Sequence, residues 1–136
     1  MAKPYMLRLL TPDKSIFEDN VEALIVPGSE GELGVLAGHT KFITDLVPGI
    51  LRYLRAGQTE RMAVSGGFAE VYPGGATVLA DTLERPEDID LERARKSKQD
   101  TEQALQERAE LDPAETQHLE ARLARAENRL KVAGRQ

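Results

Sequence analysis

Cysteine is absent from all 136 residues of the chain. Without thiols the protein has no disulfide framework, no thiolate metal site and no cysteine nucleophile, and this composition is typical of a reducing compartment. A basic surplus is lacking too, because the net charge is -5, and this disfavours a general nucleic-acid-binding protein. No uncharged apolar run approaches the roughly 18 residues of a membrane span, and the start lacks the apolar region of a signal peptide. We therefore expect a soluble cytoplasmic protein that reaches a membrane only through a partner.

Aromatic residues are missing from the second part of the chain. All six lie between Tyr5 and Tyr72, and ten of the eleven glycines precede Arg85. After Arg85 the sequence is a dense mixture of acidic and basic residues. A chain of this length can bury the core of one small domain plus an appendage that is marginal alone. The sequence predicts a domain over residues 1–84 and a different kind of structure over 85–136.

The first part has the punctuation of a β-protein. Short β-branched and aromatic runs alternate with Gly, Pro and Asp clusters at intervals of about ten residues. Val21, Ala23 and Ile25 alternate with Glu22 and Leu24, while residues 77–79 have the composition of a segment buried on both sides. Such short, closely spaced strands favour an antiparallel β-sandwich or flattened barrel. The predicted strands are 5–10, 15–26, 34–36, 49–54, 61–65, 67–71 and 76–80.

The second part has helical periodicity. Asp88 or Asp90 can cap a helix over about 90–110, although residues 95–103 contain no apolar side chain. Asp112, Pro113 and Glu115 are typical of a cap, a first helical position and a capping box. The second helix carries one apolar face made by Leu119, Leu123, Ala126 and Leu130. The fold class is therefore α+β, with an antiparallel β-sandwich followed by an antiparallel two-helix hairpin.

Residues 26–39 contain glycines three positions apart. This spacing occurs in phosphate-binding loops, but the Gly-Lys-Ser/Thr ending is absent, and Glu30 and Glu32 would repel a phosphate. We interpret these glycines as turn residues of the β-domain.

The order of several motifs resembles the epsilon subunit of bacterial F-type ATP synthase over nearly the whole chain. One position departs, because the proline often found two residues after the family's histidine is Lys41 here. The motifs are Val26-Pro27-Gly28, Glu30-Gly31-Glu32-Leu33-Gly34-Val35-Leu36, His39, Pro48-Gly49, Ser65-Gly66-Gly67-Phe68-Ala69-Glu70-Val71, Ala80-Asp81 and Ile89-Asp90.

The resemblance implies a ten-stranded sandwich that binds the gamma subunit and the ring of c subunits in the central stalk. Glu32 is the first choice for a c-ring contact, together with Glu30 and Leu33, and His39 for the nearby rotor interface. A hydrogen-bonded loop histidine is the alternative interpretation of His39. For Gly66 and Gly67 we expect a bulge or a close approach of strands.

The resemblance also implies a regulatory ATP site in the hairpin. The family uses a further arginine where this chain has Asp100, which should weaken phosphate binding. Ordinary salt bridges to Glu92, Glu102 or Glu107 are the alternative role for the arginines. The implied residues are Glu84, Ile89, Asp90, Arg93, Ala94, Arg125 and Arg129.

These observations lead to a non-catalytic rotor subunit of a proton-translocating ATP synthase. It would lie peripherally on the cytoplasmic side of the cell inner membrane, require no cofactor or metal, and bind no nucleic acid. ATP would hold the hairpin folded; without ATP the hairpin would extend and inhibit hydrolysis at the alpha and beta catalytic subunits. The alternative is a free-standing adaptor whose hairpin binds one protein. An enzyme is less favoured, because His39 and His118 are the only imidazoles and neither has a triad or metal-ligand spacing.

Overall fold

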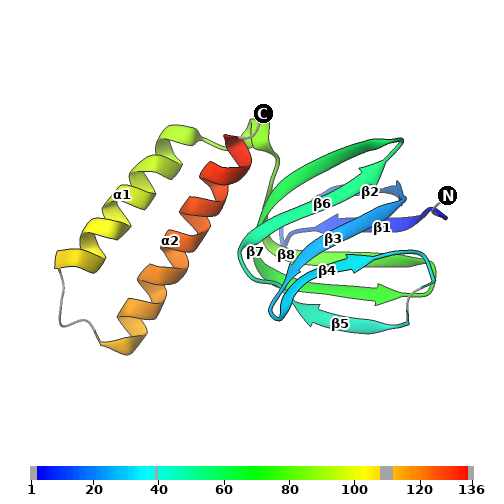
Figure 1. The fold of residues 1–136 in the computed structure, drawn as a ribbon, viewed down its shortest axis with the longest axis horizontal. Helices are drawn as coiled ribbons and strands as arrows, with labels where there is room; N and C mark the ends of the chain where they lie inside the picture. The colour runs from blue at the N-terminus through cyan, green and yellow to red at the C-terminus, as the bar shows by residue number, and fades with distance from the viewer. Residues whose placement is uncertain (1–2, 39, 108–111, 135–136) are drawn as a thin grey trace. The chain divides into compact units, whose positions relative to one another are not determined.

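The computed structural model describes residues 3–38, 40–107 and 112–134. The chain forms two compact units, Met1–Glu84 and Arg85–Gln136. The first contains eight strands and the second a short 3-10 helix, η1, followed by α1 and α2 (Figure 1). The elements are β1 Tyr5–Leu10, β2 Ser15–Val21, β3 Ala23–Gly28, β4 Gly31–Val35, β5 Phe42–Asp45, β6 Gly49–Arg55, β7 Gln58–Tyr72, β8 Gly75–Glu84, η1 Pro86–Asp88, α1 Leu91–Glu107 and α2 Pro113–Ala133.

The strands form one continuous path that doubles over. Its order is β2-β1-β8-β7-β6-β3-β4, and β5 pairs with β7 beside this path. Every neighbouring pair is antiparallel except β1 and β8, which are parallel. These two strands come from opposite ends of the unit, so no hairpin turn constrains their relative direction. The predicted α+β class and β-sandwich are confirmed, with this one parallel pair as a difference.

A bend in β7 produces the two layers. The strand runs unbroken through the predicted strands 61–65 and 67–71, and both Gly66 and Gly67 have positive φ. Its register with β8 is constant across the bend, so the predicted bulge is wrong there and the close approach is confirmed. A Cβ on Gly67 would lie against the Leu79 carbonyl and 2.7 Å from the Ala80 Cα. The described residues contain eight strands rather than ten, and both β7 and β8 cross the bend undivided.

The predicted strand 15–26 is two strands that meet at Glu22. Val21 is buried on one side of this residue and Leu24 and Val26 on the other, so the inward face changes phase. The Glu22 N–H leaves the pairing with β1 and donates to the Leu54 carbonyl at 2.8 Å. The alternation predicted through Ala23 and Ile25 is therefore wrong, because partner strands change at this point.

The two layers enclose one apolar core. Its Tyr5 is 4% exposed, and the Tyr5 hydroxyl donates to the Val35 carbonyl at 2.6 Å. This bond joins β1 to β4, which lie near opposite ends of the strand path, and so closes the sandwich. The largest fully buried side chains of this unit are Leu7, Leu9, Leu24, Leu51, Met62, Val21, Val26, Val35, Val64, Val71 and Val78.

The hairpin begins with the expected caps. The Asp90 carboxylate accepts from the Arg93 N–H at 3.1 Å, and the Asp112 carboxylate accepts from the Glu115 N–H at 2.8 Å. The predicted second helix is confirmed, and α1 ends at Glu107 in the described range. No described helix combines the length and the apolar character that a membrane crossing needs.

Small side chains fill the contact of α1 with α2. Ala94 and Thr101 are buried on α1, and the Thr101 hydroxyl donates to the Ser97 carbonyl at 2.6 Å within the same helix. On α2 the buried residue of the predicted apolar face is Ala126, while its three leucines are only partly covered. Ala side chains bury little area, so this contact stabilises the hairpin weakly.

We predict that Gly67→Ala lowers the free energy of unfolding by about 2 kcal/mol or more, because an alanine there combines positive φ with a steric clash. The measurement is urea unfolding followed by circular dichroism. Gly34→Ala is the matched control, since Gly34 lies in β4 and a Cβ added to it would meet no other atom within 4 Å. Equal losses in the two variants would contradict the role of the bend.

Burial raises the pKa of Tyr5 to about 12, above the ordinary value of about 10. The folded state therefore holds the phenol proton more tightly than the unfolded state. This contribution to stability is complete below pH 10 and falls by roughly 2 to 3 kcal/mol as the pH rises through 12. Tyr5→Phe should remove that alkaline loss. Unfolding free energies measured against pH test this, with Tyr72→Phe as the control that retains Tyr5.

Candidate functional site: an exposed sandwich face, an acidic turn and an arginine-rich hairpin

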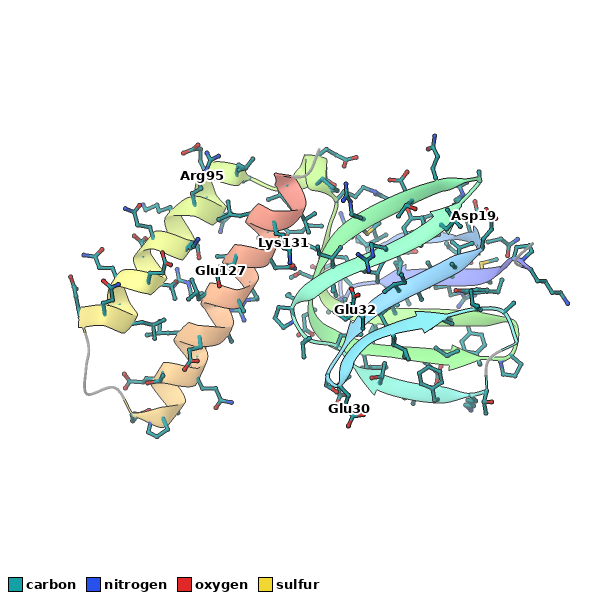
Figure 2. All side chains as sticks on the ribbon, viewed as in Figure 1. Asp19, Glu30, Glu32, Arg95, Glu127 and Lys131 are labelled. Carbon is teal, nitrogen blue, oxygen red and sulfur yellow. The ribbon has the colours of Figure 1, made fainter. Side chains whose placement is uncertain are left out.

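The acidic turn joins β3 to β4. Gly28 pairs with Gly31, so Ser29 and Glu30 form the loop, and Gly31 has φ 122°. Glu30 is exposed at the end of this β-hairpin, and Glu32 lies beyond it on β4 (Figure 2). A turn fixed by backbone pairing presents these carboxylates with little freedom, as a rigid contact requires.

Glu32 is already paired within the sandwich. Its carboxylate accepts from the Arg52 guanidinium on β6 at 3.0 Å, and the Glu32 side chain remains 58% exposed. Exposed pairs of this kind contribute about 0 to 1 kcal/mol, so a partner cation can displace Arg52 at small cost. Leu33 is half-buried against the core. His39, the fourth predicted interface residue, lies outside the described residues.

An apolar row crosses the outer surface of four strands. Leu79 on β8 pairs with Leu10 on the neighbouring β1 and with Phe68 on the neighbouring β7. Phe68 is 41% exposed and Leu79 is 37% exposed. Ile43 on β5 is 61% exposed and pairs with Glu70, which lies on the same face two residues from Phe68. We call Leu10, Phe68, Leu79 and Ile43 the outer apolar row.

Sequence reasoning missed this row. Residues 77–79 were predicted to be buried on both sides, and this prediction is wrong for Leu79, which is exposed. Two successive apolar residues such as Val78 and Leu79 occur both in strands that are covered on both faces and in strands whose outer face is exposed. The sequence therefore does not distinguish the two cases. Contiguous exposed apolar residues mark interaction surfaces in soluble proteins, so this row is a candidate docking face.

The residues implied for ATP lie in both units. Glu84 ends β8 in the first unit, and the other six belong to the second. Ile89 and Ala94 are buried, Arg93 is exposed, and Arg125 and Arg129 are half-buried. The Asp90 carboxylate already caps α1, where it retains a second oxygen for a hydroxyl or amine.

Arg93 and Arg125 occupy equivalent places in the hairpin. Each directly precedes a buried alanine, Ala94 on α1 and Ala126 on α2. Two antiparallel helices are related by an approximate two-fold axis normal to the plane that contains both helix axes. Residues that each precede the buried alanine of their helix by one position therefore lie on the same side of that plane, and this places both arginines on one side of the hairpin.

Among the described residues, Arg93 and Arg125 form none of the alternative salt bridges to Glu92, Glu102 or Glu107. Arg95 pairs with Glu92 at 2.8 Å, but both belong to α1. The side-chain amide of Gln103 donates to Glu107 at 3.0 Å, also within α1. Arg93 and Arg125 therefore keep their guanidinium groups available on the described surface. Arginines without carboxylate partners can hold a phosphate through charge-assisted hydrogen bonds.

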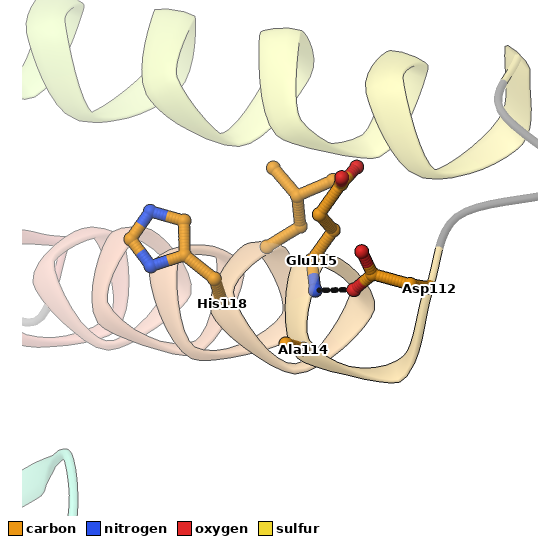
Figure 3. A pocket seen from close by; sticks show the side chains of 5 residues that line it. Asp112, Ala114, Glu115 and His118 are labelled. Atoms are coloured by element: carbon orange, nitrogen blue, oxygen red, sulfur yellow. Dashed lines mark hydrogen bonds between the residues drawn. The ribbon is translucent and has the colours of Figure 1, made fainter.

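A cavity of about 360 Å³ opens beside the start of α2, lined by Asp112, Ala114, Glu115, His118 and Leu119. Figure 3 shows the His118 ring set apart from the Asp112 carboxylate, which is engaged in the helix cap. Among the residues that the structure describes, no nucleophile or carboxylate hydrogen-bonds to this imidazole. In the described residues, no three His, Asp or Glu side chains gather as metal ligands.

Comparison with known families assigns both parts of the chain. Residues 5–86 match the model described as "ATP synthase, Delta/Epsilon chain, beta-sandwich domain", and residues 87–134 match "ATP synthase, Delta/Epsilon chain, long alpha-helix domain". The ATP synthase epsilon chain of Nitratidesulfovibrio vulgaris is 45% identical over 135 residues, which cover 98% of each chain. That of Desulforamulus reducens is 42% identical over 134 residues, covering 98% of this chain and 99% of the relative.

Solved structures agree with this assignment. A chain in the Euglena gracilis mitochondrial ATP synthase, OSCP/F1/c-ring, superposes with a TM-score of 0.79 at 30% identity, covering 92% of this chain and 78% of that one. A chain in the Tetrahymena thermophila mitochondrial ATP synthase, central stalk/c-ring, gives a TM-score of 0.62 at 15% identity over 97% and 98%, which shows the fold alone. The resemblance found in the sequence is confirmed: the chain belongs to the ATP synthase delta/epsilon-chain family, as a non-catalytic epsilon subunit of the central stalk.

Proposed function

We propose that the sandwich couples the gamma subunit to the c ring of a proton-translocating ATP synthase. The observation that carries this proposal is the outer apolar row on a sheet fixed by continuous strand pairing. A contact that transmits torque needs an interlocking surface that does not deform, and Phe68, Leu79 and Ile43 provide apolar area for such a contact with gamma. The free-standing adaptor is not retained, because both parts of the chain match one family.

The acidic turn is the proposed c-ring contact. Glu30 and Glu32 are both exposed, and the turn that carries them has a fixed backbone. Polar loops of the ring can offer cations or amides to these carboxylates, and Leu33 anchors the strand behind them in the core. The subunit then lies at the cytoplasmic side of the inner membrane, and its association with the membrane is peripheral and through the complex.

The hairpin is the proposed ATP-sensitive regulator. Arg125 and Arg129 are four residues apart, and like charges at this spacing cost a few tenths of a kcal/mol unless an anion relieves them. Asp90 would accept from the ribose or the adenine, and Arg93 with Arg125 and Arg129 would hold the phosphates. If ATP binds only the folded hairpin, a tenfold excess over Kd stabilises that state by roughly 1.4 kcal/mol.

In the extended state, the second helix would act on the catalytic subunits. From Arg122 to its end, this helix carries four basic residues and one glutamate, so it can pair with acidic segments of alpha and beta and block hydrolysis. The basic residues are Arg122, Arg125, Arg129 and Lys131.

We predict that a chain ending at Glu84 keeps ATP synthesis coupled and relieves inhibition of ATP hydrolysis in the reconstituted complex. The end point retains the whole of β8, which pairs with both β1 and β7. The measurement is hydrolysis rate and proton pumping, with the full chain as control. Hydrolysis that stays unchanged in an intact complex would exclude the inhibitory role.

We predict that the purified full chain binds ATP and that Arg93→Ala or Arg125→Ala weakens binding by about tenfold each, the loss of one charge-assisted contact. Isothermal titration calorimetry measures this. Arg95→Ala is the matched control, because Arg95 follows Ala94 and so lies on the other side of α1, where it pairs with Glu92. The absence of heat with the parent chain at millimolar ATP would leave only a mechanical role for the hairpin.

A further inference from the structure

We infer that three residues, Asp45, Leu46 and Val47, transmit torque between the outer apolar row and the acidic turn. We call these three residues the link segment. The inference rests on the proposed function, in which the row docks on gamma and the turn contacts the c ring. It assigns the mechanical path between the two contacts to a segment that belongs to neither of them.

On one edge, the link segment adds a third strand to the acidic turn. The Ser29 N–H donates to the Asp45 carbonyl at 3.0 Å, and the Val47 N–H donates to the Pro27 carbonyl at 3.0 Å. Between these two bonds, the middle residue of the segment forms an antiparallel bridge with Gly28. The end of the β3–β4 hairpin that carries the turn is therefore held by a neighbouring strand as well as by its own pairing.

On the other edge, the link segment joins the bend of β7. Asp45 ends β5 and lies opposite Phe68 of the outer apolar row. One residue further, the Leu46 N–H donates to the Gly67 carbonyl at 2.9 Å, and Leu46 itself is 6% exposed in the core. In an antiparallel ladder, successive residues direct their backbone groups to opposite edges of the strand. Three residues are therefore enough to bond the turn on one edge and the bend on the other.

A second backbone path to the acidic turn is longer. β3 also pairs with β6, but only through residues 23–25. Ser29 lies four residues beyond Ile25, which is about 13 Å along a strand. A two-stranded ribbon is marginally stable without a third strand, so a lateral force at the turn would bend the ribbon over this length. The link segment prevents such bending because it bonds at the turn itself.

Two prolines stiffen the bond between Val47 and Pro27. Pro27 has a fixed φ and no N–H, so its carbonyl is its one backbone group for pairing, and Val47 uses it. Val47 precedes Pro48, which restricts residue 47 to extended conformations. With dihedral angles restricted on both sides of this hydrogen bond, a force applied at one strand passes to the other with little deformation.

The main test is Val47→Pro, which removes the N–H that donates to Pro27. Proline fits the extended conformation that Pro48 already imposes on residue 47. Val47→Ala is the matched control, because it shortens the same side chain, which is 40% exposed, and keeps the N–H.

Ser29→Pro removes the other N–H that bonds the turn to the link segment. Neither Ser29 nor Glu30 has a positive φ, so proline is compatible with the first position of this turn. The two proline variants act on separate bonds, and both should give the same changes.

Two measurements are needed. In hydrogen exchange of the full chain, we expect Val47→Pro to speed exchange of the β4 amides by about fivefold, which corresponds to the loss of one hydrogen bond, and Val47→Ala to change it less than about twofold. In the reconstituted complex, Val47→Pro should lower the ratio of ATP synthesis to ATP hydrolysis, with as much chain bound to the complex as in the control. A segment with a purely structural role would change the exchange and leave this ratio unaltered.

The outcomes separate the inference from the function on which it rests. Unchanged exchange in both proline variants would show that the link segment does not hold the turn. Faster exchange with an unaltered ratio would show that torque takes another path, and either result overturns the inference. A chain carrying both Glu30→Gln and Glu32→Gln tests the c-ring contact by itself. If this chain lowers the ratio, the contact stands whatever the proline variants show; if it does not, the proposed contact fails and the inference fails with it.

Discussion

The bend of β7 at Gly66 and Gly67 is the constraint on which the sandwich depends. One strand of 15 residues pairs with β6 before the bend and with β5 after it, while β8 pairs with it on both sides of the bend. Gly67 lies against Leu79 and Ala80, where a side chain has no room. Val64 and Ala69 are five residues apart, a spacing that puts side chains on opposite faces of a regular strand, yet both are buried in the core. The inward face therefore changes phase at the two glycines of positive φ. After this change Phe68 and its partner Leu79 face outward, so the bend sets both the core and the candidate docking face.

Features encoded within a few residues were predictable. The Asp112 cap with Pro113 determines where α2 begins, and the Asp90 cap determines the start of α1, because both depend on contacts three residues apart. The parallel pairing of β1 with β8 was not predictable, since it joins segments about 70 residues apart. The change of face at Glu22 also depends on distant strands, because its N–H leaves the pairing with β1 for Leu54.

The candidate site divides in the same way. Motif order located Glu30, Glu32 and the Asp90 to Arg93 segment from sequence alone. The pairing of Glu32 with Arg52 needs the register across β3, and the outer apolar row needs four strands brought side by side. Leu79 illustrates the limit: a buried and an exposed leucine have the same local sequence, and only the arrangement of layers separates them.

The weak packing between the two helices of the hairpin determines how far an anion bound to its arginines can shift its folding equilibrium. The contact between α1 and α2 uses Ala94, Thr101 and Ala126, so it buries little apolar area for its length. Thr101 satisfies its own hydroxyl inside α1 and contributes no hydrogen bond to α2. A hairpin held this loosely has a folding equilibrium that about 1 kcal/mol can shift several-fold. Leucines at positions 94 and 101 would strengthen the contact if it could accommodate them, but an anion bound along Arg93 and Arg125 could then change that equilibrium very little. The small residues therefore keep the folding equilibrium of the hairpin within the range that the proposed nucleotide would shift.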